Sequence, residues 1–179
     1  MEKFEDIEYE VKRSARARRL RVTIHRDGRV VATVPRFFDL KILDKFVQEK
    51  KEWIIPRVQK FLSSPLRFVP KSSKKDYREN KDRALALVLE QLNYFNQYYG
   101  LKFNRVSIRN QRSRWGSCSK QGNLNFNYKL VFLPEEIRDY IVVHELCHLQ
   151  EFNHSNNFWY LVGQTIPNYR EIRKSLRLA

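Results

Sequence analysis

The chain has 179 residues, of which 42% are hydrophobic and 13% aromatic, and a formal net charge of +15 at pH 7. This length suffices for one globular domain or slightly more with a real core, and the sequence excludes a membrane-spanning segment because no apolar run approaches the necessary length. The basic excess, with a pI near 10.0, indicates polyanions such as nucleic acid as partners, although a basic protein without such a ligand has the same composition.

The cysteines and the amino terminus bear on the compartment. Cys118 and Cys147 are far apart and form no paired framework, which is typical of a reducing environment. The first ten residues, MEKFEDIEYE, are acidic and lack an apolar run, so we expect no secretory signal. We therefore expect a cytoplasmic protein, with Cys118 and Cys147 buried as structural residues.

The first third of the chain predicts a small sheet and a helix. Strands are predicted over Ile7–Ser14, Arg19–His25 and Arg29–Pro35. Asp27-Gly28 is a hairpin turn signal, so we expect an amino-terminal antiparallel β-hairpin and sheet, with His25 on its polar side. Asp39 is expected to cap a helix that ends near Pro56, and Trp53 to pack this helix on the sheet.

Charge and composition mark two further features of this part. Residues 11–29 carry eight basic residues against Asp27 alone, which indicates either an anion-binding face or the wet side of a sheet. Ser63–Lys75 combines prolines, serines and lysines and has the composition of a linker. We therefore expect two domains, an amino-terminal one over residues 1–70 and a second over residues 76–179.

The second part begins with a predicted helix over Tyr77–Tyr99, closed by Gly100. Strands are predicted over Phe103–Arg109, Arg114–Ser119 and Asn123–Phe132, and the last of these alternates polar and apolar residues. From Gln91 to Pro134 there is no acidic residue, so this sheet is expected to be wholly basic in charge. Pro134 is expected to open the next helix.

That helix carries a metal-binding pattern. His144 and His148 are four residues apart, so a helix places both imidazoles on one face, where they can reach one ion. Zinc hydrolases use three protein ligands and leave one position for water, and His154 is the obvious third ligand, with Glu151 and Glu171 as competitors.

The apolar surroundings favour the metal over the alternative, a hydrogen-bonded pair of core histidines, because buried polar groups need partners. Glu145, next to the first ligand, is placed to take a proton from the attacking water. Ser155 is expected to cap a short helix with Phe158 and Trp159, and a last helix is expected to end at Leu178.

Two stretches of the chain are distinctive, NQRSRWGSCSKQGNLNFNYKLVFLP (Asn110–Pro134) and VVHELCHLQEFNHSNNFW (Val142–Trp159). Together they resemble the YgjP-like family of predicted metal-dependent hydrolases, which is grouped with zincin metallopeptidases and related to the SprT type. The hairpin ending in VATVP and the helix with KKEWI also resemble this family, so the resemblance covers almost the whole chain. It implies an α+β, zincin-like fold, a metal held by His144, His148 and His154, and Glu145 as the catalytic residue.

The leading hypothesis is zinc-dependent hydrolysis of a peptide or protein substrate. The strand with Asn125 and Asn127 is expected to pair with an extended peptide along its edge, and Arg114 and Trp115 to line the cleft. A metzincin is excluded because Glu151 replaces the glycine of that motif and the only methionine is at position 1.

Three other hypotheses stay open from the residues. One is a zinc-dependent nucleotide or phosphoester hydrolase, prompted by the basic surroundings, although three histidines do not suit magnesium. Another is a basic nucleic-acid-associated domain with a structural metal, although structural zinc sites usually have four protein ligands. The third is a peptidase that acts on proteins bound to nucleic acid.

For His154 to reach the metal, the chain must bend after Gln150, and Asn153 in a left-handed conformation is the expected place.

Overall fold

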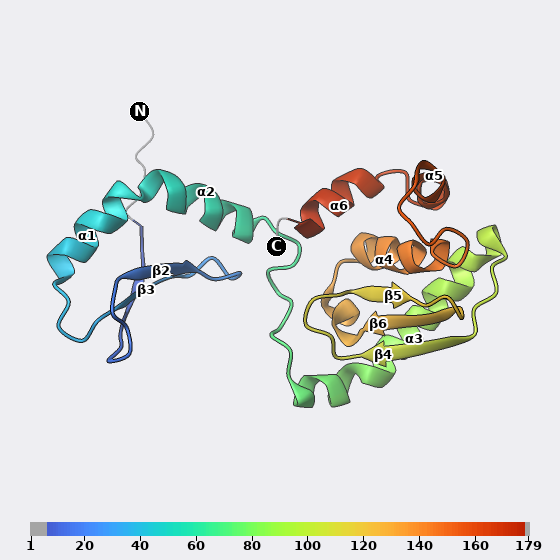
Figure 1. The fold of residues 1–179 in the computed structure, drawn as a ribbon, viewed down its shortest axis with the longest axis horizontal. Helices are drawn as coiled ribbons and strands as arrows, with labels where there is room; N and C mark the ends of the chain where they lie inside the picture. The colour runs from blue at the N-terminus through green and yellow to red at the C-terminus, as the bar shows by residue number, and fades with distance from the viewer. Residues whose placement is uncertain (1–6, 178–179) are drawn as a thin grey trace. The chain divides into compact units, whose positions relative to one another are not determined.

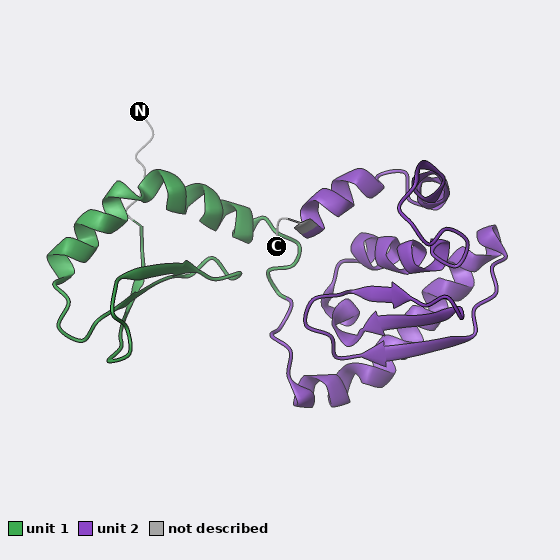
Figure 2. Ribbon diagram, in the orientation of Figure 1, with its two compact units in different colours: residues 1–68, 178–179 green, residues 69–177 purple. Residues whose placement is uncertain are grey.

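The computed structural model describes residues 7–177. These residues fall into two compact units, residues 7–68 (unit 1) and residues 69–177 (unit 2), shown in different colours in Figure 2. Each unit combines a three-stranded sheet with helices, so the fold is α+β, as predicted (Figure 1). Within the described part of the chain, no helix is both long and apolar enough to cross a membrane.

The sheet of unit 1 is built around its most apolar strand. The strands are β1 (Glu10–Arg13), β2 (Arg21–Ile24) and β3 (Val30–Val34), in the order β1-β3-β2. The β2–β3 hairpin is antiparallel, as predicted, and turns at Gly28 with a φ of 87°. The expectation of an antiparallel sheet throughout is wrong for β1, which pairs with β3 in parallel. Val30, Ala32 and Val34 are buried, which explains why β3 takes the central place between two more exposed strands.

The helical layer of unit 1 differs from the single helix that was predicted. Asp39 caps α1 (Leu40–Glu49) by accepting a hydrogen bond from the Lys41 N–H, as expected. The helix then breaks at Lys50, and α2 (Lys51–Leu62) contains Pro56 instead of ending there. Pro56 is exposed, so water can solvate the carbonyl that its missing N–H leaves free.

The core contacts of these two helices come from one face. Leu43, Val47 and Ile54 are fully buried and pack with the sheet in one cluster. Trp53 was expected to fill this place, but 44% of its surface is exposed and the Arg57 guanidinium lies 4.3 Å from its ring centroid. Successive side chains on a helix point about 100° apart, so Trp53 points away from the face that buries Ile54.

Unit 2 begins with its longest helix, α3 (Lys74–Tyr99), which starts at Ser73 and ends at Gly100 with a φ of 62°. Its sheet contains β4 (Arg105–Arg109), β5 (Gly116–Cys118) and β6 (Asn123–Asn127), in the order β4-β6-β5. Strand β6 is therefore central, parallel to β4 and antiparallel to β5. Leu124 and Phe126 of β6 are fully buried and form the middle of the core.

The strand predicted to run to Phe132 ends five residues earlier. After Asn127 the chain forms the 3-10 helix η1 (Tyr128–Phe132), and the Asn127 side chain caps it by accepting from the Lys129 N–H. The remaining helices are α4 (Glu135–Cys147), α5 (Asn156–Thr165) and α6 (Tyr169–Arg177). The predicted end of the last helix at Leu178 lies outside the described residues.

Candidate metal centre

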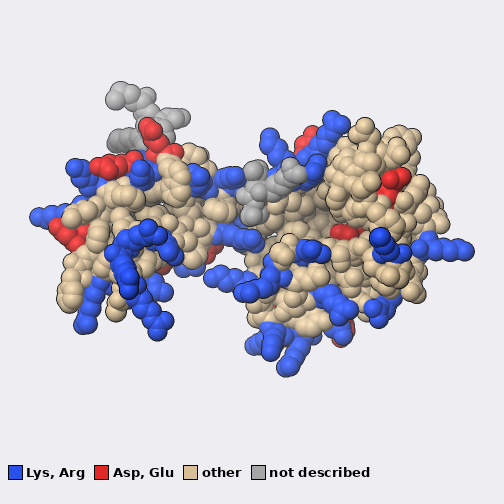
Figure 3. Space-filling model, in the orientation of Figure 1, with Lys and Arg blue, Asp and Glu red and all other residues tan. Residues whose placement is uncertain are grey.

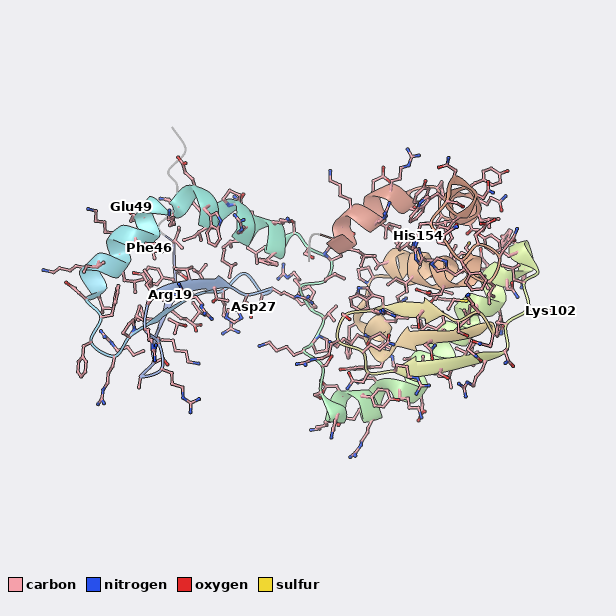
Figure 4. All side chains as sticks on the ribbon, in the orientation of Figure 1. Arg19, Asp27, Phe46, Glu49, Lys102 and His154 are labelled. Carbon is pink, nitrogen blue, oxygen red and sulfur yellow. The ribbon has the colours of Figure 1, made fainter. Side chains whose placement is uncertain are left out.

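The three histidines of the predicted motif come from one helix and the loop after it. His144 lies in α4, and His148 follows its last residue with φ −66° and ψ −14°, which is still helical. The His148 N–H donates to the His144 carbonyl at 3.3 Å, so the four-residue spacing keeps both rings on one face. His154 lies in the loop before α5, whose cap is Ser155, as predicted (Figure 4).

These three imidazoles converge. One ring nitrogen from each of His144, His148 and His154 lies within 4.8 Å of the other two, and the Nε2 atoms of His144 and His154 are 3.1 Å apart. Zinc bound at about 2.0–2.1 Å in a tetrahedron separates two nitrogen ligands by about 3.3 Å. The residues present therefore fit such an ion. Glu171 is not part of this group.

Neighbouring groups orient the rings of His144 and His148. His148 Nδ1 lies 2.9 Å from the backbone oxygen of Glu151, so this nitrogen carries the proton and Nε2 is left free. The Tyr140 hydroxyl lies 3.5 Å from His144 Nδ1. Glu151 was considered as a ligand through its carboxylate, whereas the structure uses its carbonyl to orient a ligand candidate.

Aromatic rings hold His154 from the other side. The His154 ring stacks on Trp159 with centroids 5.4 Å apart and an angle of 22°. Trp159 in turn stacks on Tyr169, 5.2 Å away, and the Arg173 guanidinium lies 4.5 Å from the Trp159 ring centroid. Residues of α5 and α6 therefore support His154, the ligand candidate that lies on a loop.

The loop itself is made differently from the prediction. No residue other than glycine has a positive φ in the described chain, so Asn153 is not left-handed. The chain leaves α4 through two successive turns, in which the Leu149 and Gln150 N–H groups donate to the carbonyls of Leu146 and Cys147. These turns redirect the backbone gradually, which removes the need for a left-handed residue.

Desolvation disfavours the charged form of His144 and of His154. Desolvation, together with the smaller effect of the neighbouring His148, lowers the pKa of His144 to about 3. Desolvation also lowers the pKa of His154. Metal ligands must be unprotonated imidazoles, so this environment favours the form that binds a cation.

Glu145 is buried beside the histidines and against the backbone of β5. It is only 6% exposed, and burial raises its pKa to about 8, with Arg114 opposing that rise. A Cβ placed on Gly116 would lie 2.5 Å from the Glu145 Cγ and 2.6 Å from its Oε1. The carboxylate therefore occupies the space that a side chain at position 116 would need.

A pocket of about 250 Å³ opens at Glu145 and His144. Arg114 and Trp115, which were expected in the substrate cleft, line this pocket together with residues that the sequence did not indicate: Gly116, Tyr140, Ile141 and Leu176. Apolar side chains thus form most of its wall. The sequence gives little signal for these residues, since they are spread over three segments, β5, α4 and α6.

Asn125 and Asn127 do not line this pocket. Asn127 is 3% exposed, and its side-chain amide donates to the carbonyls of Gln111 and Arg114, so it holds the loop before β5. Asn125 donates to the Ser117 hydroxyl across the sheet. The expectation that their strand pairs with a peptide is wrong, because β6 is central and both of its edges are occupied. The outer strand on the side of Glu145 is β5.

The two cysteines play no evident part in this centre. Both are free, and burial raises the pKa of Cys118 to about 11 and that of Cys147 to about 12. Thiols are poor nucleophiles at neutral pH under these conditions. Cys147 is fully buried in the core, as predicted.

This chain is similar to a protein family and to a solved structure. A family model described as YgjP-like, metallopeptidase domain, matches residues 18–82 and 70–179. Among solved structures, a similar one is the crystal structure of the metallopeptidase zymogen of Pyrococcus abyssi abylysin, with 28% sequence identity and a TM-score of 0.46 over 50% of this chain and 90% of that chain. No curated protein matches this chain.

Proposed function

Because this chain belongs to the YgjP-like metallopeptidase family, it is a metal-dependent hydrolase, and we propose that it is a zinc peptidase whose ligands are His144, His148 and His154. The observation that supports this proposal is the convergence of three imidazole nitrogens within 4.8 Å beside a buried carboxylate. Neutral imidazoles suit zinc, whereas magnesium and calcium prefer oxygen ligands.

A zinc ion held by His144, His148 and His154 would supply water activation near neutral pH and would polarise the carbonyl that is attacked. Glu145 accepts the proton of the attacking water and returns it to the leaving amine. Its raised pKa, about 8 from burial, suits a group that must both take and release a proton near neutral pH. Arg114, which lines the same pocket, favours the charged form of this carboxylate.

The substrate peptide pairs with the free edge of β5 in an extended conformation. This strand lies at the edge of the sheet, and its Gly116 contacts Glu145, so a peptide along β5 passes the carboxylate. The pocket of about 250 Å³ beside it, walled by Trp115, Tyr140 and Ile141, seats an apolar side chain next to the scissile bond. We assign catalysis to unit 2, which holds the three histidines and Glu145.

The test compares metal content and hydrolysis in three proteins. We expect wild type to hold about one zinc per chain by elemental analysis, and His148→Ala to lose it. Glu145→Gln should keep the zinc while its rate of hydrolysis on a peptide library falls by about 10²–10⁴-fold, the range that a general base contributes.

A nucleotide panel assayed in parallel separates this proposal from its rival. If wild type releases phosphate from a nucleotide and Glu145→Gln abolishes that activity, while no peptide or protein is cleaved, the zinc centre serves phosphoester hydrolysis and the peptidase proposal is wrong. Zinc binding that survives His148→Ala would contradict the ligand set itself.

A further inference from the structure

The parallel pairing of β1 with β3 brings two loops of unit 1 to one end of its sheet. The register places Arg13 opposite Val34, and the Ser14 N–H donates to the Val34 carbonyl at 2.9 Å. Both strands end here, so the loop of residues 14–20 and the loop of residues 35–39 leave the sheet side by side. Strand β2 begins at the same end, because Arg21 pairs with Thr33.

Six arginines and an exposed phenylalanine gather at this end. We call them the arginine edge: Arg13, Arg16, Arg18, Arg19, Arg21 and Arg36, with Phe37. All six arginines are exposed, and among the described residues none of them has a carboxylate within ion-pair distance. In Figure 3, blue side chains project from unit 1, and Figure 4 labels Arg19 on the strand side and Glu49 on the helical side.

The acidic residues of the sheet lie at its opposite end. Arg29, next to the hairpin turn, pairs with Glu10 at 3.5 Å and with Asp27 at 2.8 Å. In the two loops of the arginine edge the acidic residue is Asp39, and its carboxylate accepts the Lys41 N–H as the cap of α1. The positive charge is therefore separated from the carboxylates of the sheet.

Arg13 and Phe37 show that the edge has a defined shape. The Arg13 guanidinium donates to the carbonyls of Arg36 at 2.7 Å and Phe38 at 3.2 Å, which ties the second loop to β1. Phe38 packs against the core of unit 1, whereas Phe37 is 93% exposed. The Arg36 guanidinium lies 5.7 Å from the Phe37 ring centroid. The loop thus presents an aromatic face beside arginines.

We propose that the arginine edge binds single-stranded nucleic acid, with its arginines on the phosphates and Phe37 stacked on a base. Proteins that bind single strands combine a positive surface with aromatic side chains, because every base offers a face for stacking. A duplex hides its base faces and would leave Phe37 unused. An anionic membrane is disfavoured because one phenylalanine among six arginines offers little apolar surface to insert.

The test measures binding of a fluorescein-labelled oligothymidylate of about 20 nucleotides, longer than the roughly 4–16 that one site covers, to the full chain at several salt concentrations. The first variant, Arg16→Gln/Arg18→Gln/Arg19→Gln, removes three exposed charges whose side chains form no ion pair with any described residue. Its matched control, Arg78→Gln/Lys81→Gln/Arg83→Gln, removes three exposed charges from α3 in unit 2. The second variant is Phe37→Ala.

The two variants should weaken binding to the oligothymidylate in different ways. Each phosphate contact on a single strand contributes about 0.7 to the slope of log affinity against log salt, so the triple loop variant should bind more weakly with a slope lower by about two. Phe37→Ala should weaken binding by about tenfold at every salt concentration without changing the slope, since it removes stacking and no charge. The α3 control should bind within about twofold of wild type.

Three results would overturn the proposal. One is wild type that does not bind the oligothymidylate, or that binds a duplex of the same length or vesicles containing phosphatidylserine more tightly. Another is an α3 control that loses as much affinity as the loop variant, which would make the effect one of net charge. The last is Phe37→Ala binding as wild type does. Circular dichroism verifies that each variant is folded, and Phe37→Ala at a 93% exposed position costs little stability.

Discussion

At the scale of single residues, Gly116 is the position where the smallest change should have the largest effect on catalysis. In Gly116→Ala the new methyl group would lie 2.5 Å from the Glu145 Cγ, so the carboxylate must move. A displacement of about 1 Å at a reacting group costs about 10²-fold in rate. We expect kcat for peptide hydrolysis to fall by about that factor, while the zinc content by elemental analysis stays at the wild-type level.

The matched control for Gly116 is Gly163 in α5. There a Cβ would meet the Tyr169 ring at 3.5 Å, an ordinary contact, so Gly163→Ala should leave the rate unchanged and stabilise the helix by about 0.5–1 kcal/mol. If Gly116→Ala kept full activity, Glu145 would not need its present position, and its assignment as the base would be wrong.

Trp159 should act on the metal through His154. Its ring stacks on the one ligand candidate that lies on a loop, and an aromatic pair contributes about 0.5–1.5 kcal/mol beyond its buried area. We expect Trp159→Ala to weaken zinc binding by a few-fold to about tenfold in competition with a chromophoric chelator, and Trp159→Phe to restore most of the affinity. Tyr160→Ala, at a 70% exposed neighbour, is the control. Equal zinc affinity in all four proteins would show that the loop holds His154 without the stack.

The contacts of Gly116 and Trp159 could not be predicted from the sequence. The spacing of His144 and His148 follows from helix geometry, so the sequence alone predicts their common face. Gly116 lies 29 positions before Glu145, and Trp159 supports a loop ligand from the next helix, so neither contact has a local pattern. A glycine beside a carboxylate is visible only once strand β5 is placed on α4.

At the scale of elements, α3 and α4 are joined by a hydrogen bond from the Gln91 amide to the Asp139 carboxylate. Burial raises the pKa of Asp139 to about 6, helped by Glu135 and opposed by Arg138. Because the folded state then holds a proton that the unfolded state releases near pH 4, stability falls as the pH rises from about 4 to about 6. Above about pH 6, Asp139 is ionised in both states, so its destabilising effect no longer grows with pH.

Asp139→Asn should remove this penalty, since the asparagine carbonyl still accepts from Gln91. We expect the free energy of unfolding at pH 7 to rise by about 1 kcal/mol, a figure reduced for solvent screening of a half-buried group, and its decline between pH 4 and pH 6 to become smaller. Urea titrations at both pH values measure this. Glu90→Gln, an exposed carboxylate on α3, should change neither quantity. A loss of stability in Asp139→Asn at pH 7 would mean that the charged carboxylate stabilises the helix pair.

The ends of the helices follow from local sequence, whereas the order of the strands does not. Asp39, Gly100 and Ser155 end or begin helices where their side chains or φ angles predict, because a cap depends on the few residues beside it. The order of strands does not follow locally. Placing β3 and β6 at the centres of their sheets depends on which strand buries most apolar surface after folding, and the wrong choice for β6 led to the wrong peptide-binding edge.

At the scale of the whole molecule, each unit has a core of its own. In unit 1 the buried cluster contains Val30, Ala32, Val34, Leu43, Val47 and Ile54. Within residues 7–177, the group of side chains able to hold a metal lies in unit 2. A change of composition around Ser63–Lys75 predicts a division of the chain, but the sequence cannot tell whether the two parts unfold independently. Zinc binding can distinguish the two cases, because the proposed ligands all lie in unit 2.

Zinc should stabilise unit 2 alone. A ligand that binds only the folded state adds about 2.7 kcal/mol at a free concentration of about 100 Kd, which for a unit of this size corresponds to roughly 10 °C or more in Tm. Trp53 is the tryptophan of unit 1, so in Trp53→Phe the tryptophan fluorescence reports on unit 2, while calorimetry reports on both units. We expect zinc to raise the transition seen by fluorescence and to leave a second calorimetric transition in place, and His148→Ala to abolish the shift. A single calorimetric transition that moves as a whole with zinc would mean that the two units unfold cooperatively, and an unmoved fluorescence transition would contradict the zinc site.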